Sequence, residues 1–73
     1  MANAQMAQMN ALGARCKAFY SRMRRDTLRE ELRFRNQAVS GLKSELEDRL
    51  TRLDVAGLRE PRLLSQGQPV QGQ

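Results

Sequence analysis

The chain has 73 residues, with 13 Lys and Arg against 8 Asp and Glu, a net charge of +5, one Cys and no His. This length allows one small domain, whose core needs well-packed helices or a partner to be stable. One Cys excludes an internal disulfide, and without His it excludes a structural zinc site with four ligands. We expect no metal, no cofactor and no enzymatic activity, because catalysis usually draws on His or an activated thiol.

The positive charge is concentrated at the N-terminal end. Residues 1–25 contain five basic residues and no acid, whereas residues 26–73 contain eight of each. Three interpretations compete for such a segment: an arm that contacts the phosphates of a nucleic acid, a membrane-surface helix, and a mitochondrial transit peptide. The simpler alternative is a solvated or partner-packing basic helix. Only one Ser, Ser21, lies in this segment, which disfavours the third. Because no apolar run approaches the roughly 20 residues of a membrane-spanning helix, we expect no transmembrane segment.

The first predicted element is a basic amphipathic helix within residues 1–24. Its larger apolar residues recur at spacings of three and four: Met6, Met9, Leu12, Cys16, Phe19, Tyr20 and Met23. We expect Cys16 on this stripe to act as a small buried hydrophobe rather than a reactive thiol. In an unbroken helix, Leu28 and Leu32 would fall on the opposite side. The pattern therefore predicts a break near residues 24–27.

A second helix is predicted to start at Asp26 or Thr27. The sequence Thr27-x-x-Glu30 has the form of a capping box, in which two side chains satisfy two free amides. The helix should run to about Arg35, with Glu31 and Arg35 as an i,i+4 ion pair. Asn36 can adopt the left-handed conformation that closes a helix.

The third helix is the most regular one in the sequence. Ser40 is the expected N-cap, and one apolar face carries Leu42, Leu46, Leu50 and Leu53. Glu45 with Arg49 and Asp48 with Arg52 have the spacing of i,i+4 ion pairs. The helix should end within residues 54–57, and we expect residues 57–73 to form a flexible tail, disordered from Ser65 onward.

Residues between Thr27 and Leu50 resemble a known family. The segment reads Thr27-Leu28-x-x-x-Leu32, then Val39-Ser40-Gly41-x-Lys43-Ser44-Glu45-Leu46-x-x-Arg49-Leu50. This order resembles the SAP motif, a module of helix, extended loop and helix that here covers about half of the chain. The sequence departs from the motif at Asn36-Gln37, where Gly-Leu is usual, and at Leu42, where a polar residue is usual. Phe34 or Val39 is expected to fill the space of the missing Leu.

The resemblance implies an all-α domain in which residues 25–56 form the helical hairpin. It also implies binding of double-stranded DNA, chiefly through the backbone, and a nuclear or otherwise DNA-associated intracellular location. Mitochondrial targeting by the acid-free N-terminus is the weaker interpretation. RNA stays open as a ligand, whereas no small-molecule substrate is expected.

The residues themselves give this binding a physical rationale. A phosphate could dock on the amides at the start of the third helix, where Gly41 permits close approach of the backbone. Basic residues of the preceding helix and turn would follow the phosphate backbone. No aromatic residue follows Arg35, which disfavours a platform that stacks single-stranded bases. The predicted nucleic-acid-binding residues are Arg22, Arg25, Arg29, Arg33, Ser40, Gly41 and Lys43.

A different class of function also fits the sequence. In that alternative, the chain is a helical protein–protein interaction or oligomerisation module, and the stripe of the first helix meets a partner helix. Ser40 and Gly41 would then only cap a helix, and the basic residues would only solvate its surface. The neutral stretch after residue 25 keeps this alternative open.

Overall fold

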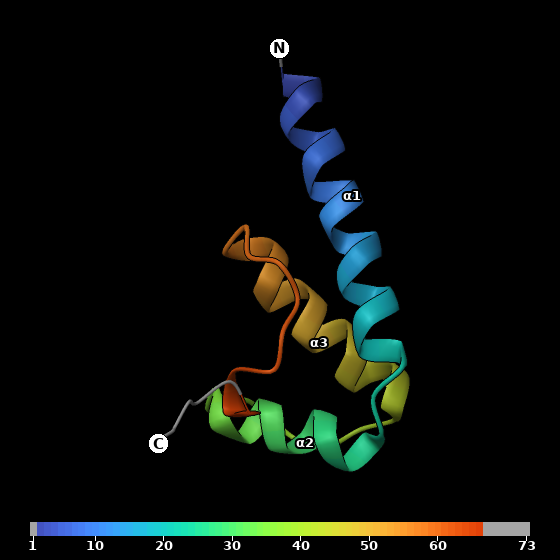
Figure 1. Ribbon diagram of the computed structural model, residues 1–73, viewed down its shortest axis with the longest axis vertical. Coiled ribbons are helices and arrows are strands. Elements are labelled where there is room, and N and C mark those ends of the chain that lie inside the picture. The colour runs from blue at the N-terminus through green and yellow to red at the C-terminus, as the bar shows by residue number, and fades with distance from the viewer. Residues whose placement is uncertain (1, 67–73) are drawn as a thin grey trace.

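The computed structural model describes residues 2–66 of the chain, with side chains from residue 7 onward. Three α-helices follow one another: α1 (Ala2–Ser21), α2 (Arg25–Phe34) and α3 (Lys43–Ala56), and a short 3-10 helix, η1 (Leu64–Gln66), ends the described part (Figure 1). These elements confirm the predicted all-α class. Met6 of the predicted stripe has its side chain outside the described residues.

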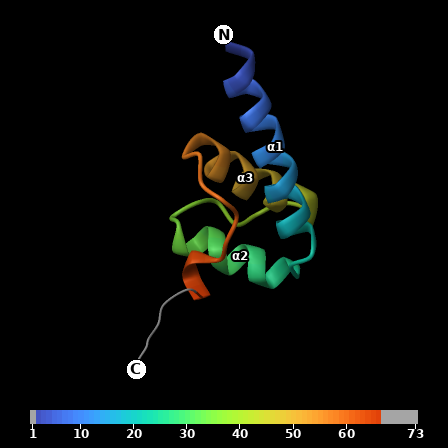
Figure 2. The same cartoon turned by 45° about the horizontal axis from the view of Figure 1, so that its top comes forward.

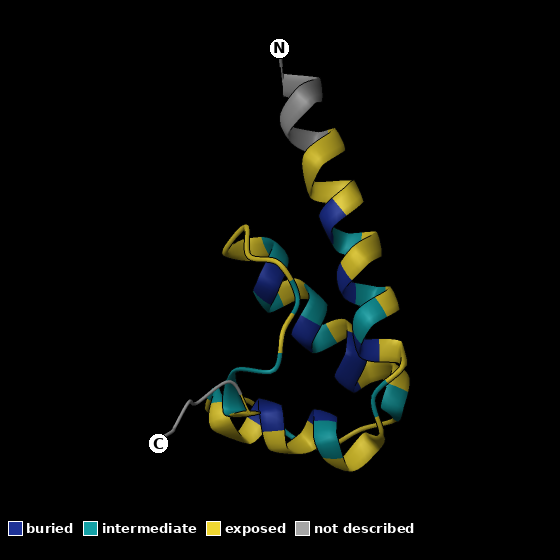
Figure 3. Ribbon diagram, viewed as in Figure 1, coloured by how far each residue is buried: buried dark blue, intermediate teal, exposed yellow. Residues whose placement is uncertain are grey.

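The core lies where α1 and α2 pack against α3. Its buried apolar residues come from all three helices: Leu12, Cys16, Tyr20, Leu28, Leu32, Leu46 and Leu50. The predicted stripe of α1 therefore completes the core of the hairpin, and Cys16 is fully buried, as expected. The N-terminal turns of α1 extend beyond α3, and their described side chains are exposed (Figure 3).

The predicted break between the first two helices is confirmed, but it falls slightly earlier. α1 ends at Ser21, and the backbone turns through bonds from the Arg22 and Met23 amides to the Phe19 and Tyr20 carbonyls. The N-cap of α2 is Arg24, which makes no side-chain capping bond, so the predicted capping box at Thr27 is wrong. The Leu28 amide donates to the Arg24 carbonyl at 3.0 Å, and this bond closes the first turn of α2.

The end of α2 follows the prediction. Asn36 takes the left-handed conformation with φ of 60°. The Gln37 amide donates to the Leu32 carbonyl at 2.8 Å, which satisfies a carbonyl that the helix end leaves free. In the loop that follows, Val39 packs against the core, whereas Phe34 is half exposed, so Val39 rather than Phe34 fills the space of the missing Leu.

The structure corrects the start of α3. Its N-cap is Leu42, not Ser40, and the Leu42 side chain is exposed rather than part of the buried face. The Glu45 carboxylate accepts the Leu42 amide at 2.8 Å, which provides one half of a capping box. Because Glu45 is used there, the predicted Glu45–Arg49 pair does not form.

Residues 57–66 differ from the predicted flexible tail. Leu58 closes α3 in the left-handed conformation with φ of 50°, and the chain then returns along the hairpin to α2 (Figure 2). Leu63 packs against the core, and η1 contacts α2. The rest of the predicted tail, residues 67–73, lies outside the described residues.

A buried polar cluster, defined as Tyr20, Glu31, Arg35 and Asp54, joins the three helices to this returning segment. The Arg35 guanidinium lies 2.7 Å from the Glu31 carboxylate and 2.9 Å from that of Asp54, and the Tyr20 hydroxyl donates to Asp54. Glu31 also accepts the amides of Leu64 and Ser65, both at 2.9 Å. The predicted Glu31–Arg35 pair thus exists, but it is buried, and Glu31 also holds the returning segment against α2.

The cluster keeps its charges because each group is multiply bonded. Burial by itself favours the neutral acid, but hydrogen bonds from Ser65, Arg35 and Leu64 outweigh it and lower the pKa of Glu31. Burial, reinforced by the bond to Asp54, raises the pKa of Tyr20 above its ordinary value. The cluster therefore fixes α2 in place without leaving a charge unpaired.

Candidate nucleic-acid interface

Five arginines form an exposed series from the end of α1 to the last turn of α2. We call Arg22, Arg24, Arg25, Arg29 and Arg33 the arginine run. All five residues are exposed, and none forms an ion pair with a described residue. The run includes four of the seven predicted binding residues. The structure thus leaves these guanidinium groups accessible to an anion from solution.

Most other cations of the chain are neutralised by nearby acids. The pairs within the described residues are Arg15–Glu60, Lys17–Asp48, Arg35–Glu31, Arg35–Asp54, Lys43–Glu47 and Arg59–Asp54. The sequence placed the excess charge in residues 1–25, but Arg15 and Lys17 of that segment meet acids from α3 and beyond. Folding therefore moves the centre of the unpaired charge from α1 to the α1–α2 turn and α2.

Two carboxylates share the surface of the arginine run on α2. Asp26 and Glu30 line a shallow depression together with Arg29 and Arg33. Asp26 lies in the first turn of α2, where it favours the helix through the positive end of its dipole. These acids reduce the local positive potential, so the strongest cationic field lies toward the turn that holds Arg22, Arg24 and Arg25.

The start of α3 lies beside the end of α1, next to this turn, in both views of the ribbon (Figures 1 and 2). The Lys43 ammonium donates to the Ser21 carbonyl at 2.9 Å and to the Glu47 carboxylate at 2.7 Å. Lys43 thus ties α3 to the residue that precedes the arginine run. Its charge is already partnered, which the sequence did not indicate.

Ser40 and Gly41 form an exposed corner in front of α3. Gly41 has φ of 118°, and a Cβ there would collide with Oε1 of Glu45. A larger residue at Gly41 would therefore disturb the folded loop itself, before any contact with a ligand. Because the Glu45 carboxylate holds the Leu42 amide, a phosphate at this helix start has only the amides that follow Leu42 to bind.

Arg49 is a positioning residue that sequence reasoning missed. Its Nη1 donates to the carbonyls of Ala38 and Ser40 at 2.9 and 3.1 Å. This guanidinium holds the loop between α2 and α3 through two carbonyls, although the sequence suggested a helix-surface pair with Glu45. Only the return of the loop over α3 brings these carbonyls within its reach.

The structure leaves little of the α1 stripe for a partner. Leu12, Cys16 and Tyr20 are buried inside the chain, so these residues of the stripe are not available to a second molecule. Met9 is partly exposed on the turns that extend beyond α3. A protein partner on α1 would therefore have to use these first turns.

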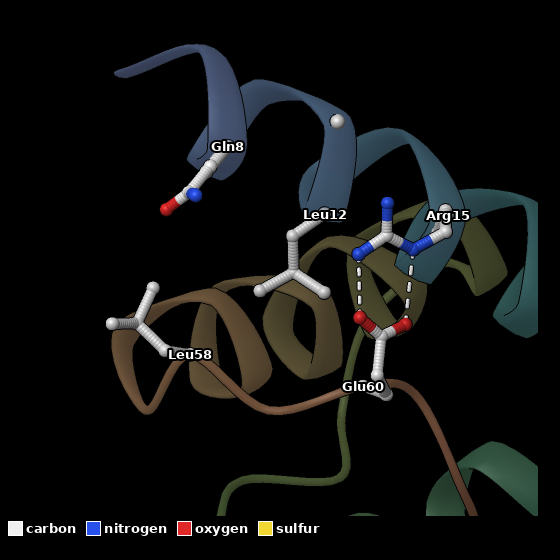
Figure 4. Close-up of a pocket in the computed structure, with 6 residues that line it drawn as sticks. Gln8, Leu12, Arg15, Leu58 and Glu60 are labelled. Carbon is white, nitrogen blue, oxygen red and sulfur yellow. Dashed lines mark hydrogen bonds and ion pairs between the residues drawn. The ribbon is translucent and has the colours of Figure 1, made fainter. Parts of the chain in front are cut away.

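A pocket of about 330 Å³ opens between α1 and the segment after α3 (Figure 4). Leu12 and Leu58 give it an apolar wall, and the Arg15 guanidinium and the Glu60 carboxylate bond to each other at its edge. Their charges are therefore mutually satisfied. Among the described residues there is no group of three or more potential metal ligands and no helix that could cross a membrane.

The fold and the arginine run define a small helical module with an unpaired basic surface around a helix–loop–helix core. A family model, the SAP domain, matches residues 19–55, which is just over half of the chain. The chain belongs to the SAP domain family, as the sequence resemblance indicated, and in general terms it is a nucleic-acid-binding module. Comparisons with curated proteins and with solved structures find no match.

The matched range contains the whole arginine run and the loop before α3, but not the whole core. Leu12 and Cys16 precede it, and the segment that bonds to Glu31 follows it. This chain therefore completes the family's hairpin with additional elements on both sides. Those elements add Leu12 and Cys16 to the core, and they pair with each other through Arg15 and Glu60.

Proposed function

We propose that this protein binds double-stranded DNA without catalysis, through contacts of the arginine run with backbone phosphates. The observation that carries this proposal is the clustering of unpaired charge: the five arginines follow one another from the α1–α2 turn along α2, lie within the SAP range, and form no ion pair with described residues. Because these guanidinium groups are exposed, they remain solvated and accessible in the folded chain. A polyanion would supply the missing partners.

The surface continues from the arginine run to the loop before α3. Ser40 and Gly41 lie at this exposed corner. Lys43, the first residue of α3, donates to the Ser21 carbonyl at the end of α1. Phosphates placed along the run could be approached by the loop backbone at the same time. The proposed contact residues are therefore Arg22, Arg25, Arg29, Arg33, Ser40 and Gly41, with Arg24 added, whereas Lys43, whose ammonium is paired with Glu47, supports this corner instead.

Duplex is favoured over single strands by the scarcity of stacking surfaces. Tyr20 is buried and Phe19 is partly buried in the core, which leaves Phe34 as the one aromatic side chain that is exposed within residues 7–66. Single-strand binding usually stacks successive bases on several rings. A DNA-associated, nuclear location is proposed together with this function.

A salt titration tests the proposal. The whole chain is titrated against one labelled duplex DNA, the corresponding single strand and a duplex RNA, each from 50 to 200 mM salt. About four phosphate contacts predict a slope of log affinity against log salt of about −3 to −4, a loss of roughly a hundredfold over this range. Duplex DNA should bind more tightly than the other two ligands.

Matched double variants locate the contacts. Replacing Arg29 and Arg33 by Gln should flatten the slope by about two units. Replacing Arg52 and Arg62 by Gln removes the same charge from exposed arginines outside the run and should leave the slope within about half a unit. Equal effects of the two variants, or no duplex binding at 50 mM salt, would overturn the proposal.

A further inference from the structure

Leu42 is unusual in two respects, its position as a helix N-cap and its exposure to solvent. It is the N-cap of α3, where Ser, Thr, Asp or Asn would accept a hydrogen bond from the first turn and Leu cannot. Its side chain is also 64% exposed, although it is a large apolar group. Neither feature stabilises the chain, and residues that violate local preferences in this way are concentrated at functional sites.

The loop that carries Leu42 is held firmly rather than left free. Arg49 holds the Ser40 carbonyl, Glu45 holds the Leu42 amide at 2.8 Å, and Gly41 adopts a φ of 118° just before it. Two hydrogen bonds therefore hold the backbone at and before this exposed apolar group, and α3 begins directly after it. An apolar contact gains from such preorganisation, because less ordering is needed on binding.

The position of Leu42 points to the ligand. The next residue, Lys43, reaches the Ser21 carbonyl, which directly precedes Arg22. The start of α3 and the start of the arginine run thus lie at the same corner of the molecule (Figure 1). A duplex bound to the arginine run brings its sugars and base edges close to this corner.

We propose that Leu42 packs against the uncharged surface of the bound duplex, the deoxyriboses and base edges of one groove. Apolar side chains that enter a groove in this way add contact area that phosphate pairing alone does not supply. Arg49 and Glu45 act as positioning residues, since they hold the loop without themselves meeting the DNA. This inference rests on the proposed function and assigns a second kind of contact to the same site.

Salt dependence separates the two kinds of contact. Loss of an apolar contact lowers affinity by the same factor at every salt concentration, because no counterion is released at it. Leu42→Ser should weaken duplex binding by roughly fivefold to thirtyfold at both 50 and 200 mM salt, with an unchanged slope. Leu42→Met, which keeps an apolar side chain of similar size, should retain most of the affinity.

Leu58→Ser is the matched control. Leu58 is 61% exposed, nearly as much as Leu42, but it lies at the opposite end of α3. This variant should bind the duplex as the wild type does. The melting temperature of Leu42→Ser should equal or exceed that of the wild type, because Ser is a favoured N-cap, so a loss of affinity cannot come from unfolding.

The outcomes distinguish this inference from the function on which it rests. If the wild type binds the duplex with a slope that depends on Arg29 and Arg33, but Leu42→Ser binds equally well, the inference about Leu42 is wrong and the proposed function stands. The same holds if Leu42→Ser changes the slope instead of the affinity at all salts. If the wild type does not bind the duplex at all, the proposed function itself fails.

Discussion

Arg33, in the last turn of α2, and Arg35, the C-cap of that helix, lie two residues apart, yet the fold gives them opposite environments. Arg33 belongs to the exposed arginine run and pairs with no described residue, whereas the Arg35 side chain is 7% exposed and pairs with both Glu31 and Asp54. Because neighbours on a helix point about 100° apart, two residues separate opposite faces. Identical side chains thus stabilise the fold on one face and remain free for a ligand on the other.

The largest effect is expected at Arg35. Arg35→Ala should cost about 3–5 kcal/mol of unfolding free energy, because it leaves two buried carboxylates without their cation. Arg33→Ala, the matched variant two residues away, should change stability by no more than about 0.5 kcal/mol. Urea denaturation of both variants measures the contrast. Equal destabilisation would mean that the two arginines do not differ in environment as described.

Leu46→Ala should cause the second largest loss of unfolding free energy. Leu46 is fully buried at the centre of α3, so its truncation leaves a cavity and should cost about 2–5 kcal/mol. That is a large part of the stability of so small a domain. Leu53→Ala, on a partly buried position of the same helix, should cost less. A thermal melt of Leu46→Ala that equals the wild type would show that α3 is not packed as described.

Acid should weaken the polar cluster but not the arginine run. The pKa of Glu31 is lowered in the folded protein, so its contribution to stability is complete at neutral pH and is lost as pH falls below about 4.3, the ordinary Glu value. Glu31→Gln should cost about 1–3 kcal/mol at pH 7 and flatten this acid dependence. Urea denaturation of the wild type and of Glu31→Gln between pH 7 and pH 3 measures both effects. An acid dependence as steep as that of the wild type would locate the sensitive group elsewhere.

The smallest effect is expected at Leu58, whose left-handed conformation is costly for a side chain with a Cβ. Leu58→Gly should raise stability by roughly 1 kcal/mol, since Gly adopts this conformation freely. The change should leave DNA affinity unaltered, because Leu58 lines the pocket near Arg15 rather than the arginine run (Figure 4). A lower melting temperature would show that the contacts of Leu58 outweigh its backbone strain.

Local pattern determined a good part of this protein. The spacing of apolar residues predicted three helices and the break after α1, and Asn36 marked the end of α2 because its left-handed conformation is a local property. The motif from Thr27 to Leu50 indicated the SAP family, and the arginine run could be named from sequence because exposed helix faces follow from the same spacing.

Tertiary structure decided which charges are free and which are used. Lys17 pairs with Asp48 of α3, and Arg15 pairs with Glu60, which lies 45 residues away. Arg49 of α3 donates to a carbonyl of the preceding loop. Glu31 became a buried tether because the segment after α3 returns to it, a path that no local pattern specifies. Helix spacing is a short-range property that sequence carries directly, whereas the pairing of a charge depends on what the fold brings beside it.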